Sequence, residues 1–145
     1  MTIGGFFILR DSCIIDKANF MQKQSRIAIL GFGREGQAVF KFLRKYEKRP
    51  TRNIFILDKN INIKVPSGAR AILGKNYLKN IQDFDKIFRS PGIPYNLPEI
   101  QRAHGVGVQI SSATKLFFEN ARGTIIGITG TKGKGTTSTL LYEIL

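Results

Sequence analysis

Two glycine-rich segments of this chain have the residue types and the spacing that bind phosphate groups. The first reads Gly-x-Gly-x-x-Gly at Gly31, Gly33 and Gly36, where glycine allows the backbone to turn tightly and to approach a ligand closely. The amide groups at the start of the helix expected after it would then face a phosphate. Asp58 ends the next expected strand and can accept a hydrogen bond from a ligand hydroxyl or ring N–H. In the alternative interpretation the glycines serve only packing between strand and helix, and Asp58 caps a turn.

The second segment follows an apolar run and combines glycine, lysine and threonine. A phosphate-binding loop needs successive backbone N–H groups that point inward, a lysine that reaches the outer phosphates, and a hydroxyl group for Mg²⁺. Gly133 and Lys134, with Thr136 and Thr137 directly behind them, supply all three. The general pattern G-x-x-x-x-G-K-[ST] is not met literally, because Ile128 stands in place of its first glycine. We expect this loop to bind a nucleoside triphosphate; the alternative is a glycine-rich loop without function.

Short apolar runs that alternate with helical stretches must position these loops. Continuous apolar runs are expected for strands that are buried on both faces of a parallel sheet. We expect strands at residues 27–30, 53–58, 69–73, 86–89, 107–110 and 124–128. We expect helices after the first glycine loop, at 98–104 and at 113–120. The last of these would be capped by Ser111 or Ser112, with Leu116 and Phe117 in its apolar stripe.

This order of elements predicts an α/β fold. We expect a Rossmann-like parallel sheet domain, followed by the first strand, the P-loop and the helix of a second α/β domain. The expected boundaries are an N-terminal extension of unknown role at 1–20, the Rossmann-like domain at 21–111, and the beginning of the second domain at 112–145. Because the chain stops at Leu145, inside the helix that the second loop should start, we expect it to be a truncated piece of a larger protein.

Composition and charge exclude several classes of protein. The 145 residues, 42% of them hydrophobic, suffice for a buried core, and no apolar run approaches the ~18 residues that a membrane span requires. One cysteine, Cys13, and one histidine exclude an internal disulfide and a structural zinc site. The formal net charge of +13 suits solvated faces or a binder of phosphorylated small ligands. A nucleic-acid surface is not expected, because no basic run is interleaved with stacking aromatics.

Several motifs together resemble the Mur ligase family. The segment ITGTKGKGTT is similar to the ATP loop of these enzymes, which usually reads T-G-[ST]-N-G-K-[ST]-T. Before it, at matching intervals, ILGFGREG, RSPGI and ISSATKLFFENA resemble the D-glutamate-adding, MurD-type members. The resemblance covers residues 26–145, and its specificity lies in the combination of the motifs.

The resemblance implies a three-domain, cytoplasmic and monomeric enzyme of peptidoglycan synthesis. Such an enzyme uses ATP and Mg²⁺ to attach D-glutamate to UDP-N-acetylmuramoyl-L-alanine through an acyl phosphate. The residues that would bind the UDP end of the substrate are Gly33, Arg34, Glu35, Gly36, Asp58, Lys59 and Gly92. The residues that would bind ATP are Gly130, Thr131, Lys132, Gly133, Lys134, Gly135, Thr136 and Thr137, with Lys134 catalytic. This chain alone is expected to be inactive, because it would hold only half of the ATP site.

Two residues depart from the usual ATP loop of the family. Lys132 stands where the family usually has Asn, and Gly135 where it usually has Ser or Thr. Glycine after the lysine resembles the folylpolyglutamate synthases, whose loop places the hydroxyl one position later, so Thr136 is the expected Mg²⁺ ligand. Those synthases lack a Rossmann-like domain ahead of the loop.

Other functions remain open at this level. The muramate–alanine ligase, another Mur ligase, shares the Rossmann-like domain, although its ATP loop typically carries His before Gly-Lys. A non-catalytic Rossmann module that binds NAD or another nucleotide would explain the first glycine loop but not the second. A basic adaptor for nucleic acid would explain only the charge.

Overall fold

The structure is a computed structural model that describes residues 6–9 and 25–145. Contacts divide the chain into two compact units, Asp16–Glu119 and Met1–Ile15 with Asn120–Leu145. The expected N-terminal extension lies outside the described residues except for Phe6–Leu9. The domain boundaries expected at residues 20 and 111 stay predictions.

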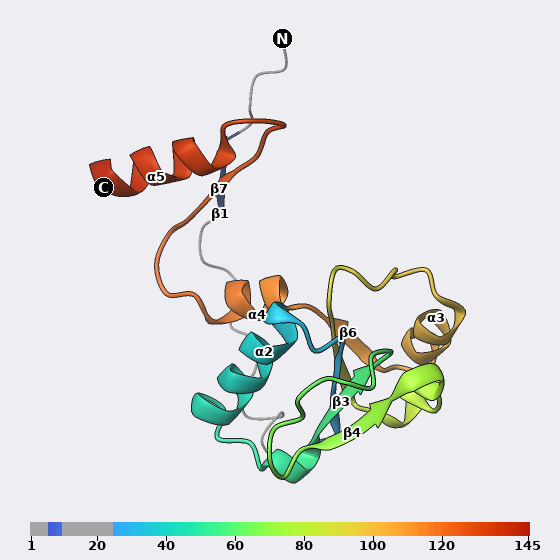
Figure 1. Ribbon diagram of the computed structural model, residues 1–145. Helices are drawn as coiled ribbons and strands as arrows, with labels where there is room; N and C mark the ends of the chain where they lie inside the picture. Colours follow the sequence, from blue (N-terminus) through green and yellow to red (C-terminus); the bar gives the residue numbers. More distant parts are fainter. Residues whose placement is uncertain (1–5, 10–24) are drawn as a thin grey trace. The chain divides into compact units, whose positions relative to one another are not determined.

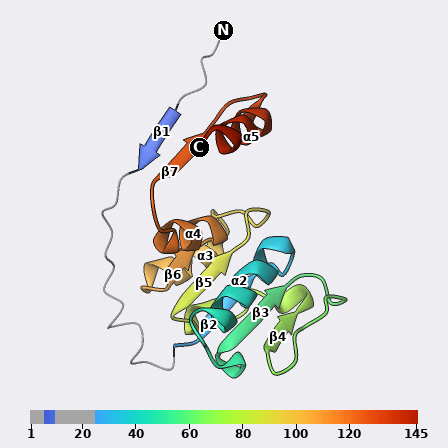
Figure 2. The ribbon, with the colours of Figure 1, turned by 90° about the vertical axis from the view of Figure 1, so that its left-hand side faces the viewer.

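The larger unit is built on a parallel sheet of five strands. In chain order these are β2 (Ile27–Leu30), β3 (Ile54–Asp58), β4 (Arg70–Leu73), β5 (Lys86–Arg89) and β6 (Gln109–Ser111). Their order in the sheet is β4-β3-β2-β5-β6, with every neighbouring pair parallel (Figure 2). The chain therefore moves outward from β2 in one direction and then returns to β5 on its other side. In such doubly wound sheets ligands bind at the carboxyl ends of the strands where this direction reverses.

Among the described residues, three α-helices cover the two faces of this sheet. They are α2 (Arg34–Lys45), α3 (Pro98–Gly105) and α4 (Ala113–Asn120), and short 3₁₀ turns lie at Thr51–Asn53, Gly74–Asn76 and Ile81–Asp83. Helices α2 and α4 lie on one face and α3 on the other (Figure 1). This two-sided cover explains why the strands read as continuous apolar runs.

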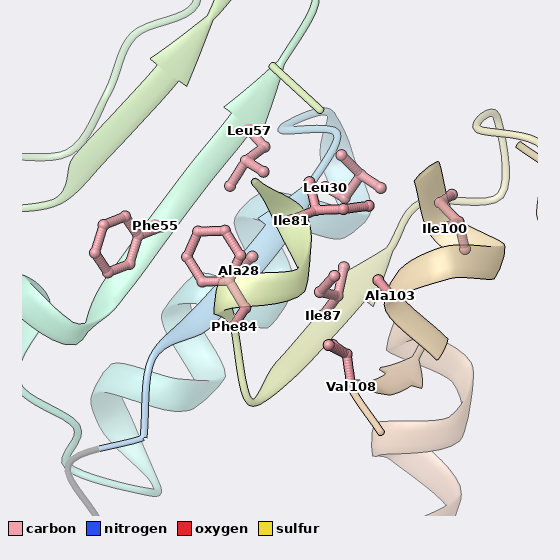
Figure 3. Close-up of a cluster of buried hydrophobic side chains, with 10 residues drawn as sticks. All are labelled: Ala28, Leu30, Phe55, Leu57, Ile81, Phe84, Ile87, Ile100, Ala103 and Val108. Carbon is pink, nitrogen blue, oxygen red and sulfur yellow. The ribbon is translucent and has the colours of Figure 1, made fainter. Parts of the chain in front are cut away.

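Each face of the sheet has its own buried cluster. On one face Val39 and Leu43 of α2 and Leu116 of α4 pack against the strands. On the other, Ile100 and Ala103 of α3 join side chains from β2, β3 and β5, as Figure 3 shows. The clusters fix α2 and its N-terminal loop against the central strand, which positions the first glycine loop. The expected Rossmann-like fold is confirmed.

Two details of the sequence prediction were wrong: the start of the last strand of this sheet and the burial of Phe117 in α4. The strand begins at Gln109, not Gly107, because Gly107 has φ +94° and donates its N–H to the His104 carbonyl at 3.0 Å. The serine cap of α4 is confirmed: Ser111 lies in β6, and Ser112 caps the helix by accepting the Lys115 amide at 3.1 Å. Phe117 is 60% exposed and leaves the apolar stripe of α4 to Leu116.

The smaller unit holds the second glycine loop. Strand β1 (Phe6–Leu9) pairs antiparallel with β7 (Ile125–Ile128), and β7 leads through the loop into α5 (Lys134–Ile144). The sequence predicts a helix started by this loop; it begins at Lys134, and no residue of α5 is buried. None of the helices in residues 25–145 is long and apolar enough to span a membrane.

Candidate functional site

The first glycine loop crosses from β2 to α2 at the point where the strand order reverses. Gly31 has φ +89° and donates its N–H to the Leu57 carbonyl at 2.8 Å; a Cβ there would lie 2.9 Å from Cβ of Ser90. At Gly36 a Cβ would lie 2.2 Å from the Gly31 carbonyl oxygen. Both positions thus require glycine so that strand, loop and helix can pack closely. For these two glycines the packing interpretation is sufficient.

Gly33 is different, because close packing among the described residues does not require a glycine there. Its backbone is extended, with φ −74° and ψ −159°, which any residue can adopt, and no atom lies within 4 Å of a Cβ built there. It is the N-cap of α2 but offers no side-chain hydrogen bond to the free amides of the first turn. Arg34 and Glu35, which follow it, are exposed. Glycine at position 33 therefore leaves an open approach to the N-terminus of α2.

Asp58 connects the end of β3 to the first glycine loop. One carboxylate oxygen accepts the Phe32 amide at 2.7 Å, and the other accepts the Asn60 amide at 2.8 Å. The carboxylate thus holds both the glycine loop and the turn after β3. Each oxygen keeps a further lone pair for a ligand. Lys59 beside it is exposed.

The loop after β5 completes this region. Ser90 donates its N–H to the Leu30 carbonyl and its hydroxyl to the Gly31 carbonyl, both at 2.9 Å. Gly92, two residues further, is exposed and has no atom within 4 Å of a Cβ built there. The expected UDP-binding residues thus gather at the carboxyl ends of β2, β3 and β5. Their binding of UDP stays a prediction.

A shallow hollow lies against this region, on the face of the sheet that α2 and α4 cover. Its lining includes Glu35, Gly36, Arg89, Ser90 and Ala113. Sequence reasoning did not single out Ser90 or Arg89 as site residues. The available signal was their position, since both lie where β5 ends beside β2, at the reversal of strand order.

The second glycine loop has the backbone geometry of an anion nest. Gly133 is left-handed, with φ +77° and ψ 0°, and directly precedes the first helical residue of α5. A left-handed residue next to a right-handed one turns successive N–H groups toward the same point. The Lys134 ammonium folds back over the loop and donates to the Gly130 carbonyl at 2.7 Å. Two of its three hydrogens stay available to an anion.

The hydroxyl groups behind the lysine fall into two classes. Ser138 and Thr139 donate to the carbonyls of Lys134 and Gly135, at 2.8 and 3.0 Å, and are thereby committed to the helix. In the described part of the chain, the hydroxyls of Thr136 and Thr137 make no such bond. An exposed lysine, a nest of amides and a free hydroxyl fit a triphosphate with Mg²⁺. Among the described residues there is no group of three His, Cys, Asp or Glu side chains that could hold a metal on its own.

The fold of the larger unit agrees with the protein family that this part of the chain matches. Residues 25–112 match the family model described as Mur ligase MurD-like, N-terminal domain. The chain belongs to the MurD-like Mur ligase family. The matched residues span the five-stranded sheet with the first glycine loop, Asp58 and Gly92.

Curated relatives with the name UDP-N-acetylmuramoylalanine--D-glutamate ligase extend the similarity past this domain. One from Acetivibrio thermocellus is 34% identical over 131 residues, which cover 85% of this chain and 27% of the relative. Relatives from the Loch Maree and Kyoto strains of Clostridium botulinum are each 32% identical over 142 residues, which cover 89% of this chain and 30% of the relative. This MurD-like chain therefore spans less than a third of the length of these relatives.

Proposed function

We propose that this chain is the substrate-binding and phosphate-loop part of an ATP-dependent ligase of peptidoglycan synthesis. The ligase would attach D-glutamate to UDP-N-acetylmuramoyl-L-alanine through an acyl phosphate, in the cytoplasm, where ATP is available. Family membership and the names of the relatives support the ligase class and these substrates. The observation that carries the proposal is the open approach to the N-terminus of α2 at Gly33.

The strand order suggests how the UDP-linked substrate would lie. The helix N-terminus between β3 and β5 attracts a diphosphate, because its free amides and the helix dipole both favour negative charge. Asp58 and Lys59 at the end of β3 would then lie near the uracil. Gly92, at the end of β5 on the opposite side of β2, would lie near the sugar. The space beside Gly33 allows the diphosphate to contact the main chain directly.

Lys134 and the loop before it would hold the phosphates of ATP. The task is to bring the γ-phosphate to a carboxylate on a substrate that already carries a diphosphate. The Lys134 ammonium and the amides after Gly133 offset this repulsion and stabilise the charge that spreads over the transferring phosphoryl group. Bound Mg²⁺, with the Thr136 hydroxyl as its protein ligand, would neutralise further phosphate charge. We expect binding without turnover from the 145 residues, because they span less than a third of the length of the related ligases.

The UDP proposal is tested by calorimetric titration of UDP-N-acetylmuramoyl-L-alanine and of NAD into the 145-residue chain. We expect binding of the UDP compound and no heat from NAD. Gly33→Ala should lower the affinity for the UDP compound by about tenfold or more, because the added methyl group would lie where the diphosphate approaches. Gly105→Ala is the matched control, since Gly105 also has no atom within 4 Å of its Cβ but lies at the end of α3. Tight NAD binding with no response to the UDP compound would refute the assignment.

The ATP proposal is tested by titrating ATP with Mg²⁺ into the same chain. Lys134→Ala should lower the affinity for ATP by about 10- to 100-fold, the usual effect of losing a hydrogen bond to a charged group. Lys79→Ala, which removes an exposed lysine from the other unit, should leave the affinity unchanged. Both variants should bind the UDP compound as the wild type does. Equal ATP affinity in the wild type and Lys134→Ala would show that the phosphate-loop assignment is wrong.

A further inference from the structure

Arg89 ends β5 and lies against the loop that follows it. Its Nη1 donates to two carbonyl groups of that loop, Ser90 at 3.2 Å and Ile93. Its guanidinium carbon also lies 5.8 Å from the centre of the Tyr95 ring, within cation–π range. One side chain therefore contacts the beginning, the middle and the end of the loop Ser90–Tyr95.

This loop has few hydrogen bonds of its own. Pro91 and Pro94 have no N–H group and cannot donate. The Ile93 amide closes a turn onto the Ser90 carbonyl at 3.1 Å, and Gln101 of α3 donates to the Tyr95 carbonyl at 2.7 Å. Ser90 is also held by its bonds to the carbonyls of Leu30 and Gly31, and the other contacts come from Arg89. The Arg89 side chain therefore helps to hold the loop, while Gly92 within the loop is exposed.

The charge of Arg89 is used for these carbonyl groups and not for an ion pair. In the described part of the chain, no carboxylate lies within ion-pair distance of its guanidinium. Hydrogen bonds from an ionised donor are stronger than neutral ones. The two N–H groups of Arg89 Nη1 have fixed directions in the guanidinium plane, and that plane also stacks on aromatic rings such as Tyr95. A lysine in its place would keep the charge but not the planar group.

The same loop is connected to the first glycine loop. The Ser90 hydroxyl donates to the Gly31 carbonyl, and a Cβ at Gly31 would lie 3.2 Å from Cδ1 of Ile93. We propose that Arg89 is a positioning residue for the UDP-linked substrate: it holds Ser90–Tyr95 in the shape that presents Gly92 to the sugar. This proposal rests on the proposed function, in which the sugar lies at the end of β5.

The experiment compares two ligands, UDP and UDP-N-acetylmuramoyl-L-alanine, by calorimetric titration into the 145-residue chain. The variants are Arg89→Lys, Arg89→Gln and the control Arg44→Gln. Arg44 also donates Nη1 to a backbone carbonyl, that of Arg49 at 3.1 Å, but at the opposite end of α2 from the site. In Arg89→Gln we expect the affinity for UDP-N-acetylmuramoyl-L-alanine to fall by about 10- to 100-fold and the affinity for UDP to change by less than about threefold. Arg89→Lys should recover only part of the loss, and Arg44→Gln should bind both ligands as the wild type does.

Two further readouts separate positioning from a general structural role. The amide resonance of Gly92 should shift in ligand-free Arg89→Lys and Arg89→Gln, while resonances of β2 and β3 stay in place. Equal weakening of both ligands together with a lower melting temperature would overturn the proposal, as would unchanged affinity for the muramoyl ligand. If the wild type binds UDP but gains nothing from the muramoyl group, the proposal for Arg89 fails while UDP binding stands. If the wild type binds neither ligand, the proposed function fails first.

Discussion

Replacing Gly36 by alanine should destabilise the fold, although alanine is the better helix former. Gly36 lies in the first turn of α2, and a Cβ there would lie 2.2 Å from the Gly31 carbonyl oxygen and 3.2 Å from Cγ2 of Ile29. The first distance is more than about 1 Å short of the ~3.5 Å at which non-bonded heavy atoms attract each other. The obstacle is main chain, which cannot rotate away as a long side chain would. Either α2 moves off the sheet or the glycine loop is pushed aside.

The size of the effect follows from two opposing contributions. Overpacking a tight site costs about 1–3 kcal/mol, and a backbone obstacle places this case near the upper value. The better helix propensity of alanine returns at most about 1 kcal/mol. We therefore expect Gly36→Ala to lower the free energy of unfolding by about 2 kcal/mol. For a domain of this size that corresponds to a fall in melting temperature of about 8–16 °C.

Gly33→Ala provides the contrast within the same loop. No atom lies within 4 Å of its Cβ position, so only the loss of a glycine N-cap, below about 1 kcal/mol, should reduce its stability. Thermal unfolding followed by circular dichroism, with titration of the UDP compound, measures both properties. Gly36→Ala should lose mainly stability, and Gly33→Ala mainly affinity. If Gly36→Ala unfolds at the wild-type temperature, or if the two variants lose equal stability, the assignment of the two glycines to packing and to ligand approach is refuted.

Three further substitutions test other parts of the structure. Burial lowers the pKa of Lys86 below 10.5. The unfolded chain therefore binds more protons than the folded one, and the free energy of unfolding should rise as the pH approaches 10.5. Lys86→Met should remove this rise, which urea denaturation across that pH range measures. Asp58→Asn leaves one oxygen to accept the two backbone amides of Phe32 and Asn60, the first of which lies at 2.7 Å in the wild type. The free energy of unfolding of this variant should fall by about 1–3 kcal/mol. An unchanged value would show that the carboxylate does not hold the loop. Thr136→Ala should make ATP affinity insensitive to Mg²⁺ in calorimetry, whereas Ser138→Ala should keep the sensitivity, because that hydroxyl is bonded within the helix.

The fold could be predicted from the sequence wherever local pattern determines it. The strands Ile27–Leu30 and Lys86–Arg89 and the helix Ala113–Asn120 have the predicted bounds, because continuous apolar runs and a serine cap are local signals. The prediction failed at Gly107, where a left-handed turn delays the strand, and at Phe117, whose burial depends on what packs against α4. The helix and strand propensities of single residues predict neither the turn nor the burial.

The site was less predictable than the fold because its contacts join residues far apart in the chain. The hydrogen bond from Ser90 to Gly31 joins residues 59 positions apart, and no local sequence pattern predicts it. The pattern Gly-x-Gly-x-x-Gly also treats its three glycines alike. Only the structure separates Gly36, which the packing requires, from Gly33, which it does not.

The two glycine loops, proposed as anion sites, are held in different ways. In the first, Gly31 and Gly36 are required by close packing, so the main sheet holds the loop in one shape and leaves Gly33 open for a ligand. In the second, Gly133 supplies one left-handed residue, and apart from its chain neighbours no described residue lies within 4 Å of its Cβ position. A site held by the sheet needs little ordering when a ligand binds, whereas a loop with few contacts loses more conformational entropy. On this argument the UDP end of the substrate should bind to a preformed site, and the Lys134 loop should become ordered as the triphosphate binds.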